Sequence, residues 1–324
     1  MRTVNFTIES WPFIEPFAIT GHTFNASNIL LVTITEENHT GKGEGSGVFY
    51  AGETSESMFV QASSIKSQIE NGCSRDELLK LLPPGGARNA IDCALWDLET
   101  KSLGKNIWET TGVIKKKIET VFTIGIDTPE KMALKAKSLQ TKYIKVKLSG
   151  DKPVERIKAV IKARPDAKIV VDVNQGWSFK QLTELAPIFK ELGVLMIEQP
   201  LPRGKDSELE NYTSPVPLCA DESCLDSNDL EYVVKRYQMI NIKLDKTGGL
   251  TEALLLAQNA KSKNLGLMVG NFQGTSLGMA PAYIIAQMCD YIDLDGPIFL
   301  QKDREYGLKY DNGVVSGLTS KLWA

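Results

Sequence analysis

Three carboxylates each end a short apolar run of the β-strand type, and this repeated pattern carries the chemistry of the sequence. The runs end at Asp172, Glu198 and Asp221. The first of them is apolar on both faces, which is typical of a strand buried within a parallel sheet. Because parallel neighbours end at one edge of a sheet, we expect the three side chains to converge, and converging buried carboxylates require a cation. Oxygen ligands without His or Cys suit Mg²⁺ rather than zinc.

Lysine side chains occupy the inward face of two further predicted strands. Lys145 and Lys147 lie two residues apart and therefore share a face, while the apolar residues between and around them take the face toward the helices. Lys243 has the same place in residues 239–244. The second and sixth strands of an eight-stranded barrel lie opposite each other. We therefore expect Lys147 and Lys243 to flank the pocket, with the carboxylates between them.

The alternation around Lys243 also predicts where its neighbours point. Asn241 and Asp245 share its parity and are predicted to point inward. Lys246 falls outside the alternation and is predicted to be a surface charge. The inward side of this strand is therefore expected to carry an amide, an ammonium group and a carboxylate.

Two lysines on opposite sides of a ligand held by a magnesium ion favour one type of reaction. Mg²⁺ would bind a substrate carboxylate and stabilise the enediolate that forms when the adjacent carbon loses its proton. A lysine can accept that proton only when it is neutral, and the neighbouring Lys145 and the cation would both lower its pKa. Removal of the proton on one side and its return on the other inverts a stereocentre. The pattern therefore predicts a racemase or epimerase.

Each of these residues also has a purely structural interpretation. A single inward lysine is usually an ion-pair partner, and Asp172 or Glu198 alone would more often be a hydrogen-bonded structural acid. That interpretation must, however, place three acids and three lysines at the same end of one barrel. We therefore favour the catalytic interpretation for the group as a whole.

Strand and helix patterns alternate from about residue 118, and this alternation predicts the scaffold of the site. Strands are expected at 119–124, 143–147, 168–173, 194–198, 217–220, 239–244, 266–270 and 291–294. Helices are expected at 129–140, 152–164, 178–192, 226–236, 250–264 and 275–288. This α/β pattern, without a dinucleotide fingerprint, favours a closed TIM-type barrel of the (β/α)7β kind over an open doubly wound sheet. The C-terminal ends of the strands hold the chemistry in such barrels.

The residues on either side of the barrel pattern predict an α+β capping domain. Strands are expected at 3–9, 28–35 and 43–50, and helices at 53–70, 74–81 and 88–103. The glycine-rich run 43–47 lacks the strand-before, helix-after context of a phosphate loop, so a nucleotide site is not expected there. We predict a capping domain at 1–115, a barrel at 116–295 and a tail at 296–324 that completes the capping domain.

Composition excludes several classes of protein. The net charge of −3 gives no basic footprint for nucleic acid. The N-terminus lacks a signal pattern and no apolar run could span a bilayer, so no membrane partner is expected. The five scattered cysteines are expected to be reduced thiols, which favours a cytoplasmic location. Two histidines nearly exclude His-dependent triads and zinc sites. Whether the chain forms a homo-oligomer is left open.

The motifs together resemble the muconate lactonising subgroup of the enolase superfamily, over nearly the whole chain. The segments that carry the resemblance are Lys145-Val-Lys147, Asp172-Val-Asn174, Ile197-Glu198-Gln199-Pro200, Ala220-Asp221-Glu222-Ser223 and Asn241-Ile242-Lys243. The resemblance implies that Asp172, Glu198 and Asp221 ligate Mg²⁺, with one ion per subunit.

The resemblance also implies roles for the lysines and for the last strand. Lys147 and Lys243 would be the acid/base pair, and Lys145 would assist the substrate carboxylate. The segment Asp293-Leu294-Asp295-Gly296-Pro297 resembles the motif by which dipeptide epimerases bind the α-ammonium group of the substrate. Residues 241–254 and the opening residues 1–4 resemble bacterial L-Ala-D/L-Glu epimerases. A small dipeptide is therefore the expected substrate.

The capping loop at residues 20–25 departs from the expected pattern. Members that act on glutamate-containing dipeptides typically carry an arginine there, whereas this chain has Phe24 at about that place. An aromatic ring favours an apolar or uncharged side chain on the substrate. Thr123, Asn271 and Phe272 are further candidates for lining the substrate.

Two other interpretations remain open at this point. A lyase or cycloisomerase, such as o-succinylbenzoate synthase or muconate cycloisomerase, would use the same scaffold without an α-ammonium group on its substrate. A barrel that binds Mg²⁺ and a small acid as a sensor would show no α-proton exchange at all.

Overall fold

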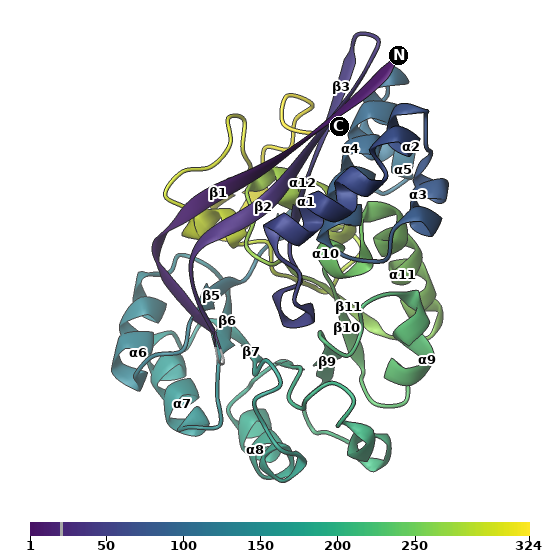
Figure 1. Cartoon of the computed structure of the whole chain (residues 1–324). Helices are drawn as coiled ribbons and strands as arrows, with labels where there is room; N and C mark the ends of the chain where they lie inside the picture. The colour runs from purple at the N-terminus through teal and green to yellow at the C-terminus, as the bar shows by residue number, and fades with distance from the viewer. Residues whose placement is uncertain (20–21) are drawn as a thin grey trace.

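A long antiparallel ribbon opens the chain in this computed structural model, which describes residues 1–19 and 22–324. Strands β1 (Arg2–Ile19) and β2 (His22–Glu36) pair from Arg2 opposite Glu36 to Ile19 opposite His22, with a register shift between Pro12 and Phe17. Both strands are longer than predicted. The expected capping loop is strand from His22 onward, and its residues 20 and 21 lie outside the described part. The ribbon leads down to the mouth of the barrel (Figure 1).

Strand β3 (His39–Ser46) completes this sheet and explains the glycine-rich run. A Cβ atom on Gly43 would lie 2.1 Å from the carbonyl oxygen of Ala90 in α4 (Gly86–Ser102). Gly41 and Gly45 meet the same helix in the same way. The glycines therefore let β3 and α4 approach closely. The other helices of this part are α1 (Ser55–Ser64), α2 (Lys66–Glu70), α3 (Arg75–Leu81) and α5 (Ile107–Thr111).

A parallel sheet forms the second part and confirms the predicted fold class. Among the described residues it has eight strands in the order of the sequence: β5 (Phe122–Ile124), β6 (Tyr143–Lys147), β7 (Lys168–Asp172), β8 (Ile197–Glu198), β9 (Leu218–Ala220), β10 (Met239–Ile242), β11 (Gly266–Val269) and β12 (Tyr291–Ile292). The backbone N–H of Val121, just before β5, donates to the carbonyl oxygen of Ile292 at 2.8 Å. This bond joins the two edges of the sheet, as a closed barrel requires.

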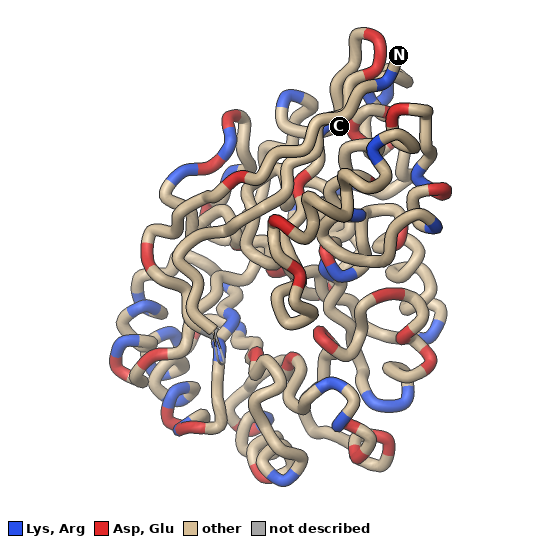
Figure 2. Tube along the Cα trace, in the orientation of Figure 1, with Lys and Arg blue, Asp and Glu red and all other residues tan. Residues whose placement is uncertain are grey.

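Helices cover the outside of this barrel and alternate with its strands. They are α6 (Pro129–Ser138), α7 (Pro153–Ala163), α8 (Phe179–Glu191), α9 (Leu230–Val233), α11 (Leu250–Ser262) and α12 (Ser276–Ala286), with the single turn α10 (Leu244–Thr247) before α11. The predicted helix at 226–236 forms as a short 3₁₀ turn, η3 (Ser227–Asp229), followed by α9. Between β8 and β9 the chain has only the 3₁₀ helix η2 (Ser207–Asn211). Lys, Arg, Asp and Glu are interspersed over these outer elements (Figure 2).

The tail contacts both parts of the molecule. After the 3₁₀ helix η4 (Gly296–Phe299), strand β13 (Lys309–Asp311) pairs with β14 (Val314–Ser316), which in turn pairs with β4 (Ile118–Glu119). The segment before β13 contacts the ribbon instead: Leu300 forms an isolated bridge with Phe13. Arg304 makes ion pairs with Glu9 on β1 and Glu44 on β3. The backbone N–H of Gln301 also donates to the carbonyl oxygen of Pro12 on β1 at 2.9 Å, so the tail is bonded to the N-terminal sheet through both side chains and backbone. Of the helices in the two described ranges, none combines the length and apolarity needed to cross a membrane.

Candidate active site

The three predicted ligands lie side by side at one end of the barrel. Asp172 and Glu198 are the last residues of β7 and β8 and are directly paired across those strands, and Asp221 follows the last residue of β9. All three are at most 1% exposed. The apolar residues of each strand bury the backbone, so each carboxylate emerges at the strand end, as predicted.

Lys145 occupies the centre of the site. Its Nζ lies 3.0 Å from Asp172 Oδ2, 2.7 Å from Glu198 Oε2 and 2.7 Å from Asp293 Oδ2. Lys147, at the end of the same strand, donates to Asp172 Oδ2 at 2.6 Å and to Asn174 Oδ1 at 2.9 Å. Both lysines are buried and inward-facing, as the alternation along β6 predicted.

Two lysines bind Asp221, and one of them corrects a prediction. Lys243 Nζ lies 2.7 Å from Asp221 Oδ2. Lys246 Nζ lies 2.7 Å from Asp221 Oδ1 and also donates to the backbone carbonyls of Asp221 and Asn241. The prediction that Lys246 is a surface charge is wrong, because it is only 2% exposed. The strand ends before Lys243, and the turn of α10 brings the side chain three residues later back to the same carboxylate.

Asp245 also departs from its predicted place. It is buried, but its Oδ1 accepts from the backbone N–H of Ser46 at 2.8 Å and from Nδ2 of Asn89 in α4 at 2.7 Å. It therefore joins the barrel to the capping sheet instead of lining the pocket with Lys243. Asn241 does point inward, since its Nδ2 donates to Glu198 Oε1 at 2.6 Å.

The charges in the centre shift one another's pKa. Burial alone would raise the pKa of Asp172, but the ammonium groups of Lys145 and Lys147 lower it to about 2. Burial and the Asp172 carboxylate raise the pKa of Glu198 to about 7. Burial would lower the pKa of Lys145, but Asp172, Asp293 and Glu198 together raise it well above its ordinary value. These carboxylates therefore favour the charged form of Lys145.

The same opposition holds around Asp221. Burial would raise the pKa of Asp221, but Lys243 and Lys246 lower it well below its usual range. Burial would lower the pKa of Lys243, but Asp221 and Glu198 raise it above its ordinary value, which is opposite to the lowering predicted from the sequence for a lysine that acts as a base. Burial and the adjacent Asp221 raise the pKa of Glu222 to about 8.

The donor set fits a hard divalent cation in type and charge. In the part of the chain that the structure describes, no three His, Cys, Asp or Glu side chains are gathered closely enough to form a metal cage. The predicted ligands face ammonium groups instead, and Lys145 bridges two of them. The site nevertheless buries six carboxylates against four ammonium groups: Asp172, Glu198, Asp221, Glu222, Asp293 and Asp295 against Lys145, Lys147, Lys243 and Lys246. When all are ionised, a divalent cation would balance this excess.

A small pocket of about 30 Å³ lies above these groups. Lys147 and Lys243 both line it, together with Asn174, Asp221, Glu222, Asn271, Gln273 and four aromatic side chains: Phe24, Phe49, Tyr50 and Phe272. The ring of Phe272 lies 4.7 Å from Lys243 Nζ, and the ring centroids of Phe24 and Phe49 are 5.4 Å apart. Phe24, Asn271 and Phe272 are thus brought to one pocket with both lysines, as the sequence suggested.

Asp293 and Asp295 follow the last strand, β12, and a residue that lines this pocket contacts the first of them. Asn271 Nδ2 donates to the carbonyl oxygen of Asp293 at 2.8 Å. Asp295 Oδ2 accepts from the backbone N–H of Thr123 at 2.7 Å. Burial and the nearby Asp293 carboxylate raise the pKa of Asp295 well above its usual value. Thr123 therefore reaches Asp295 through its backbone.

A buried polar cluster behind the carboxylates was missed in the sequence. The Oε1 atom of Gln199 accepts from the backbone N–H groups of Asp221 at 2.9 Å and Ser223 at 3.0 Å, and its Nε2 donates to the hydroxyl of Tyr237. That hydroxyl donates to Asp206 at 2.6 Å. Gln199 stands within the Glu-Gln-Pro segment and could have been noticed there, whereas Asp206 follows a loop without any pattern.

Comparisons with known proteins agree with this geometry. Residues 1–112 match the family model for the mandelate racemase / muconate lactonizing enzyme N-terminal domain, and residues 130–315 match the enolase C-terminal domain-like model. The chain is 40% identical over 317 residues to the L-Ala-D/L-Glu epimerase of Escherichia coli (strain K12), covering 97% of this chain and 99% of that protein. It is 44% identical over 248 residues to an N-acetyl-D-glutamate racemase from a Pseudoalteromonas species, covering 76% and 79%.

Solved structures lead to the same group. An enolase family member from Agrobacterium tumefaciens with homology to dipeptide epimerases, with bound sodium and L-Ala-L-Glu, superposes with a TM-score of 0.97 at 38% identity over 100% of both chains. The dipeptide epimerase from Cytophaga hutchinsonii, complexed with Mg and D-Ala-L-Val, has a TM-score of 0.92 at 27% identity, covering 98% and 93%. The chain belongs to the mandelate racemase / muconate lactonizing enzyme family of the enolase superfamily, and it is an isomerase of the racemase and epimerase class.

Proposed function

We propose that this protein is a Mg²⁺-dependent dipeptide epimerase that inverts the α-carbon of the C-terminal residue with two lysines. One observation carries the proposal: Lys147, at the end of the second barrel strand, and Lys243, directly after the sixth, line a single pocket. A ligand in that pocket would have one amine on each side. The similarity to dipeptide epimerases supports the same reaction.

The chain's own residues divide the work of this reaction. One lysine takes the α-proton while neutral, and the other, as an ammonium group, returns a proton on the opposite face. Lys145 remains charged and would hold the substrate carboxylate next to the reacting carbon. The Asp293 and Asp295 pair would bind the α-ammonium group of the substrate. Its positive charge would stabilise the ionised form of these two neighbouring buried carboxylates.

Asp172, Glu198 and Asp221 are the residues that would hold one Mg²⁺ per subunit. When bound, this ion would supply Lewis-acid stabilisation of the negative charge that develops on the substrate carboxylate. The proposal is supported by the carboxylate-only donor set, whose three buried side chains lie at neighbouring strand ends. Solved dipeptide epimerases related to this chain contain Mg.

The rings of Phe24, Phe49 and Phe272 would surround the side chain of the residue that is epimerised. No arginine stands among residues 20–25, so we propose an apolar or uncharged side chain there rather than glutamate. The relative from Escherichia coli is named for glutamate. The specificity of this chain would then differ from that of this relative.

A deuterium exchange screen tests the proposal. Purified protein with MgCl₂ in heavy water should incorporate deuterium at the α-carbon of the C-terminal residue of L-Ala-L-X dipeptides, as followed by mass spectrometry. Apolar and uncharged X should exchange fastest. Faster exchange with X = Glu would contradict the specificity but retain the reaction, and absence of exchange from every dipeptide would contradict the reaction itself.

An N-acyl amino acid racemase is the second candidate, favoured by the 44% identical relative named N-acetyl-D-glutamate racemase. The same lysines would serve, but that substrate has no α-ammonium group. Replacement of Asp295 with Asn should nearly abolish dipeptide exchange while leaving exchange from N-acetyl amino acids nearly intact. A cycloisomerase or o-succinylbenzoate synthase would share this indifference to Asp295 and would convert its own substrate. A cytoplasmic location and a homo-oligomer stay predictions.

A further inference from the structure

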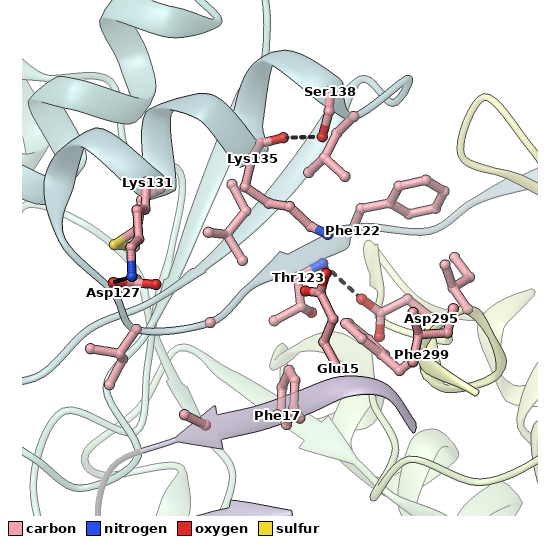
Figure 3. Close-up of a pocket in the computed structure, with 18 of the residues that line it drawn as sticks. Glu15, Phe17, Phe122, Thr123, Asp127, Lys131, Lys135, Ser138, Asp295 and Phe299 are labelled. Carbon is pink, nitrogen blue, oxygen red and sulfur yellow. Dashed lines mark hydrogen bonds and ion pairs between the residues drawn. The ribbon is translucent and has the colours of Figure 1, made fainter. Parts of the chain in front are cut away.

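A second and larger cavity lies on the other side of the strand end that carries Asp293 and Asp295. It has a volume of about 630 Å³ and opens between β1, β5, α6 and η4 (Figure 3). Asn271 lines the small pocket and bonds the backbone of Asp293, whereas Asp295 lines the large cavity. The segment from Asp293 to Asp295 thus separates the two spaces. A group bound at the Asp295 carboxylate can extend into the larger cavity.

The walls of this cavity are mainly apolar. Phe17 on β1 and Phe299 on η4 form one side, with their ring centroids 5.0 Å apart. Ile124 on β5 and Met132 on α6 form the other side, and both are at most 2% exposed. Ile298 completes the lining next to Asp295. The interior therefore suits an apolar group that begins at the Asp295 carboxylate.

Charged groups lie at the outer side of the cavity. Lys131 pairs with Asp127 at 3.3 Å, and both are largely exposed. The side chains of Lys135 and Glu15 reach in from α6 and β1 (Figure 3). Solvated side chains of both signs at the mouth do not select for a charged ligand. Asp295 is the buried charged side chain of this lining, and its partner should be a cation.

We propose that this cavity is the subsite for the N-terminal residue of the substrate and that it accepts a bulky apolar residue such as leucine or phenylalanine. The proposal rests on the proposed dipeptide epimerase function. With the α-ammonium group at Asp293 and Asp295, the side chain on the same carbon leaves the small pocket and enters the space between Phe17, Phe299 and Ile298. An alanine methyl group would leave most of that space unfilled.

The size of the cavity decides between a small and a large N-terminal residue. Cavities of several hundred Å³ are typical of sites for whole small molecules. A filled apolar pocket discriminates by about 10-fold or more for each added methylene group that it buries. We therefore expect kcat/KM for L-Leu-L-X to exceed that for L-Ala-L-X by at least about 10-fold, with X held constant.

The experiment compares L-Ala-L-X, L-Leu-L-X and L-Phe-L-X by α-deuteration of residue X, in the native protein and in two variants that fill the cavity. The Ile298→Trp variant places a large ring next to Asp295, and Leu134→Trp acts from the exposed face of α6, where folding is not at risk. In each variant the ratio of kcat/KM for leucine to that for alanine should fall toward one. Lys137→Ala, on the same helix but outside the lining, is the control and should keep the native ratio.

The outcomes separate this inference from the proposed function. Exchange that is fastest with N-terminal alanine in the native protein would overturn the inference and leave the dipeptide epimerase function standing. An unchanged ratio in both Trp variants would also overturn it, because the side chain would then lie elsewhere. Absence of exchange from all three dipeptides would overturn the proposed function, and the inference with it.

Discussion

The ammonium group of Lys246 lies 2.7 Å from Asp221 Oδ1, and neither side chain is more than 2% exposed. Lys243 takes the other carboxylate oxygen at the same distance. One carboxylate thus holds two buried ammonium groups, of which only Lys243 reaches the pocket that would receive the substrate. Lys246 binds Asp221 without lining this pocket, so it supports the carboxylate and would not contact the substrate.

Replacement of Lys246 with Ala should therefore weaken the site without removing a reacting group. Asp221 keeps Lys243 as a partner, but the backbone carbonyls of Asp221 and Asn241 lose a buried donor, which costs about 1–3 kcal/mol of folding free energy. We also expect Mg²⁺ affinity to fall at least about 10-fold, as for other groups that support a metal ligand. Urea unfolding and calorimetric titration with MgCl₂ measure the two effects. Lys263→Ala, which breaks an exposed pair with Glu231, is the matched control and should change neither. Unchanged Mg²⁺ affinity in Lys246→Ala would contradict this account.

Inversion should require both pocket lysines. Exchange of the α-proton of a given stereoisomer should require only one of them. Without Lys147, the remaining Lys243 can exchange the α-proton of one stereoisomer only, and the reverse holds without Lys243. We expect epimerisation to fall by about 10³-fold or more in Lys147→Ala and in Lys243→Ala. Chiral chromatography combined with mass spectrometry separates inversion from exchange. Lys105→Ala, in the exposed link between α4 and α5, serves as control. If either variant still inverts the carbon at the native rate, two-base transfer is refuted.

Chelation of divalent ions should abolish α-proton exchange, and MgCl₂ should restore it. Glu198→Gln removes one negative donor from a position that is fully buried and already in contact with Lys145. Its affinity for Mg²⁺ should be lower than that of the native protein by about 10-fold or more, as calorimetry can measure. Glu231→Gln, on the surface, should bind Mg²⁺ as the native protein does. Equal affinities in the native protein and in Glu198→Gln would refute the assignment of Glu198 as a ligand.

The buried carboxyl of Asp245 should make stability depend on pH. Burial raises its pKa from 3.8 to about 7. The folded state therefore binds this proton more tightly than the unfolded state does. The stabilisation that the protonated Asp245 gives the folded state is fully present below about pH 4 and is lost as pH rises through about 7. Asp245→Asn keeps the acceptor for Ser46 and Asn89 but carries no charge. The difference in unfolding free energy between this variant and the native protein should increase in favour of the variant by up to about 1.4 kcal/mol per pH unit, between about pH 4 and pH 7. A difference that stays constant from pH 4 to pH 8, measured by urea unfolding, would refute the assignment.

The contact between β3 and α4 should tolerate no side chain at Gly43. A Cβ there would lie 2.1 Å from the carbonyl oxygen of Ala90, so strand and helix must separate. We expect Gly43→Ala to lower the unfolding free energy by about 3 kcal/mol. Gly52 has no atom within 4 Å of an added Cβ and has a φ of +77°. Its replacement by Ala should cost only about 1 kcal/mol, through backbone strain alone. Equal urea midpoints for the two variants would show that the glycine contact with α4 is not tight.

The barrel and its acidic end could be predicted because the evidence is local. Asp172 and Glu198 each follow a buried apolar run, and Lys145 and Lys147 share the parity of one strand. These patterns decide which face each side chain takes, and parallel strand order then brings the side chains together. The domain bounds at 115 and 295 stay a prediction. The tail contacts both parts, since β14 pairs with β4 while Leu300 bridges Phe13 on the ribbon.

The misplaced residues depend on where a strand ends. Lys246 and Asp245 were assigned by continuing the alternation of the strand, but β10 ends at Ile242 and α10 begins at Leu244. A four-residue helix is too short to leave a periodic pattern. Asp206 was missed for another reason. Its partners, Ser223 and Tyr237, are distant in sequence and adjacent only in the fold.

Phe24 and Phe49 belong to the N-terminal ribbon and the turn after β3, while the lysines below them belong to barrel strands. The substrate specificity of this enzyme can therefore change without loss of the residues that carry out the reaction. Libraries restricted to Phe24, Phe49 and Tyr50 would vary the aromatic side chains of the pocket and leave Lys147 and Lys243 unchanged. Such libraries offer a direct route to catalysts for unnatural peptides.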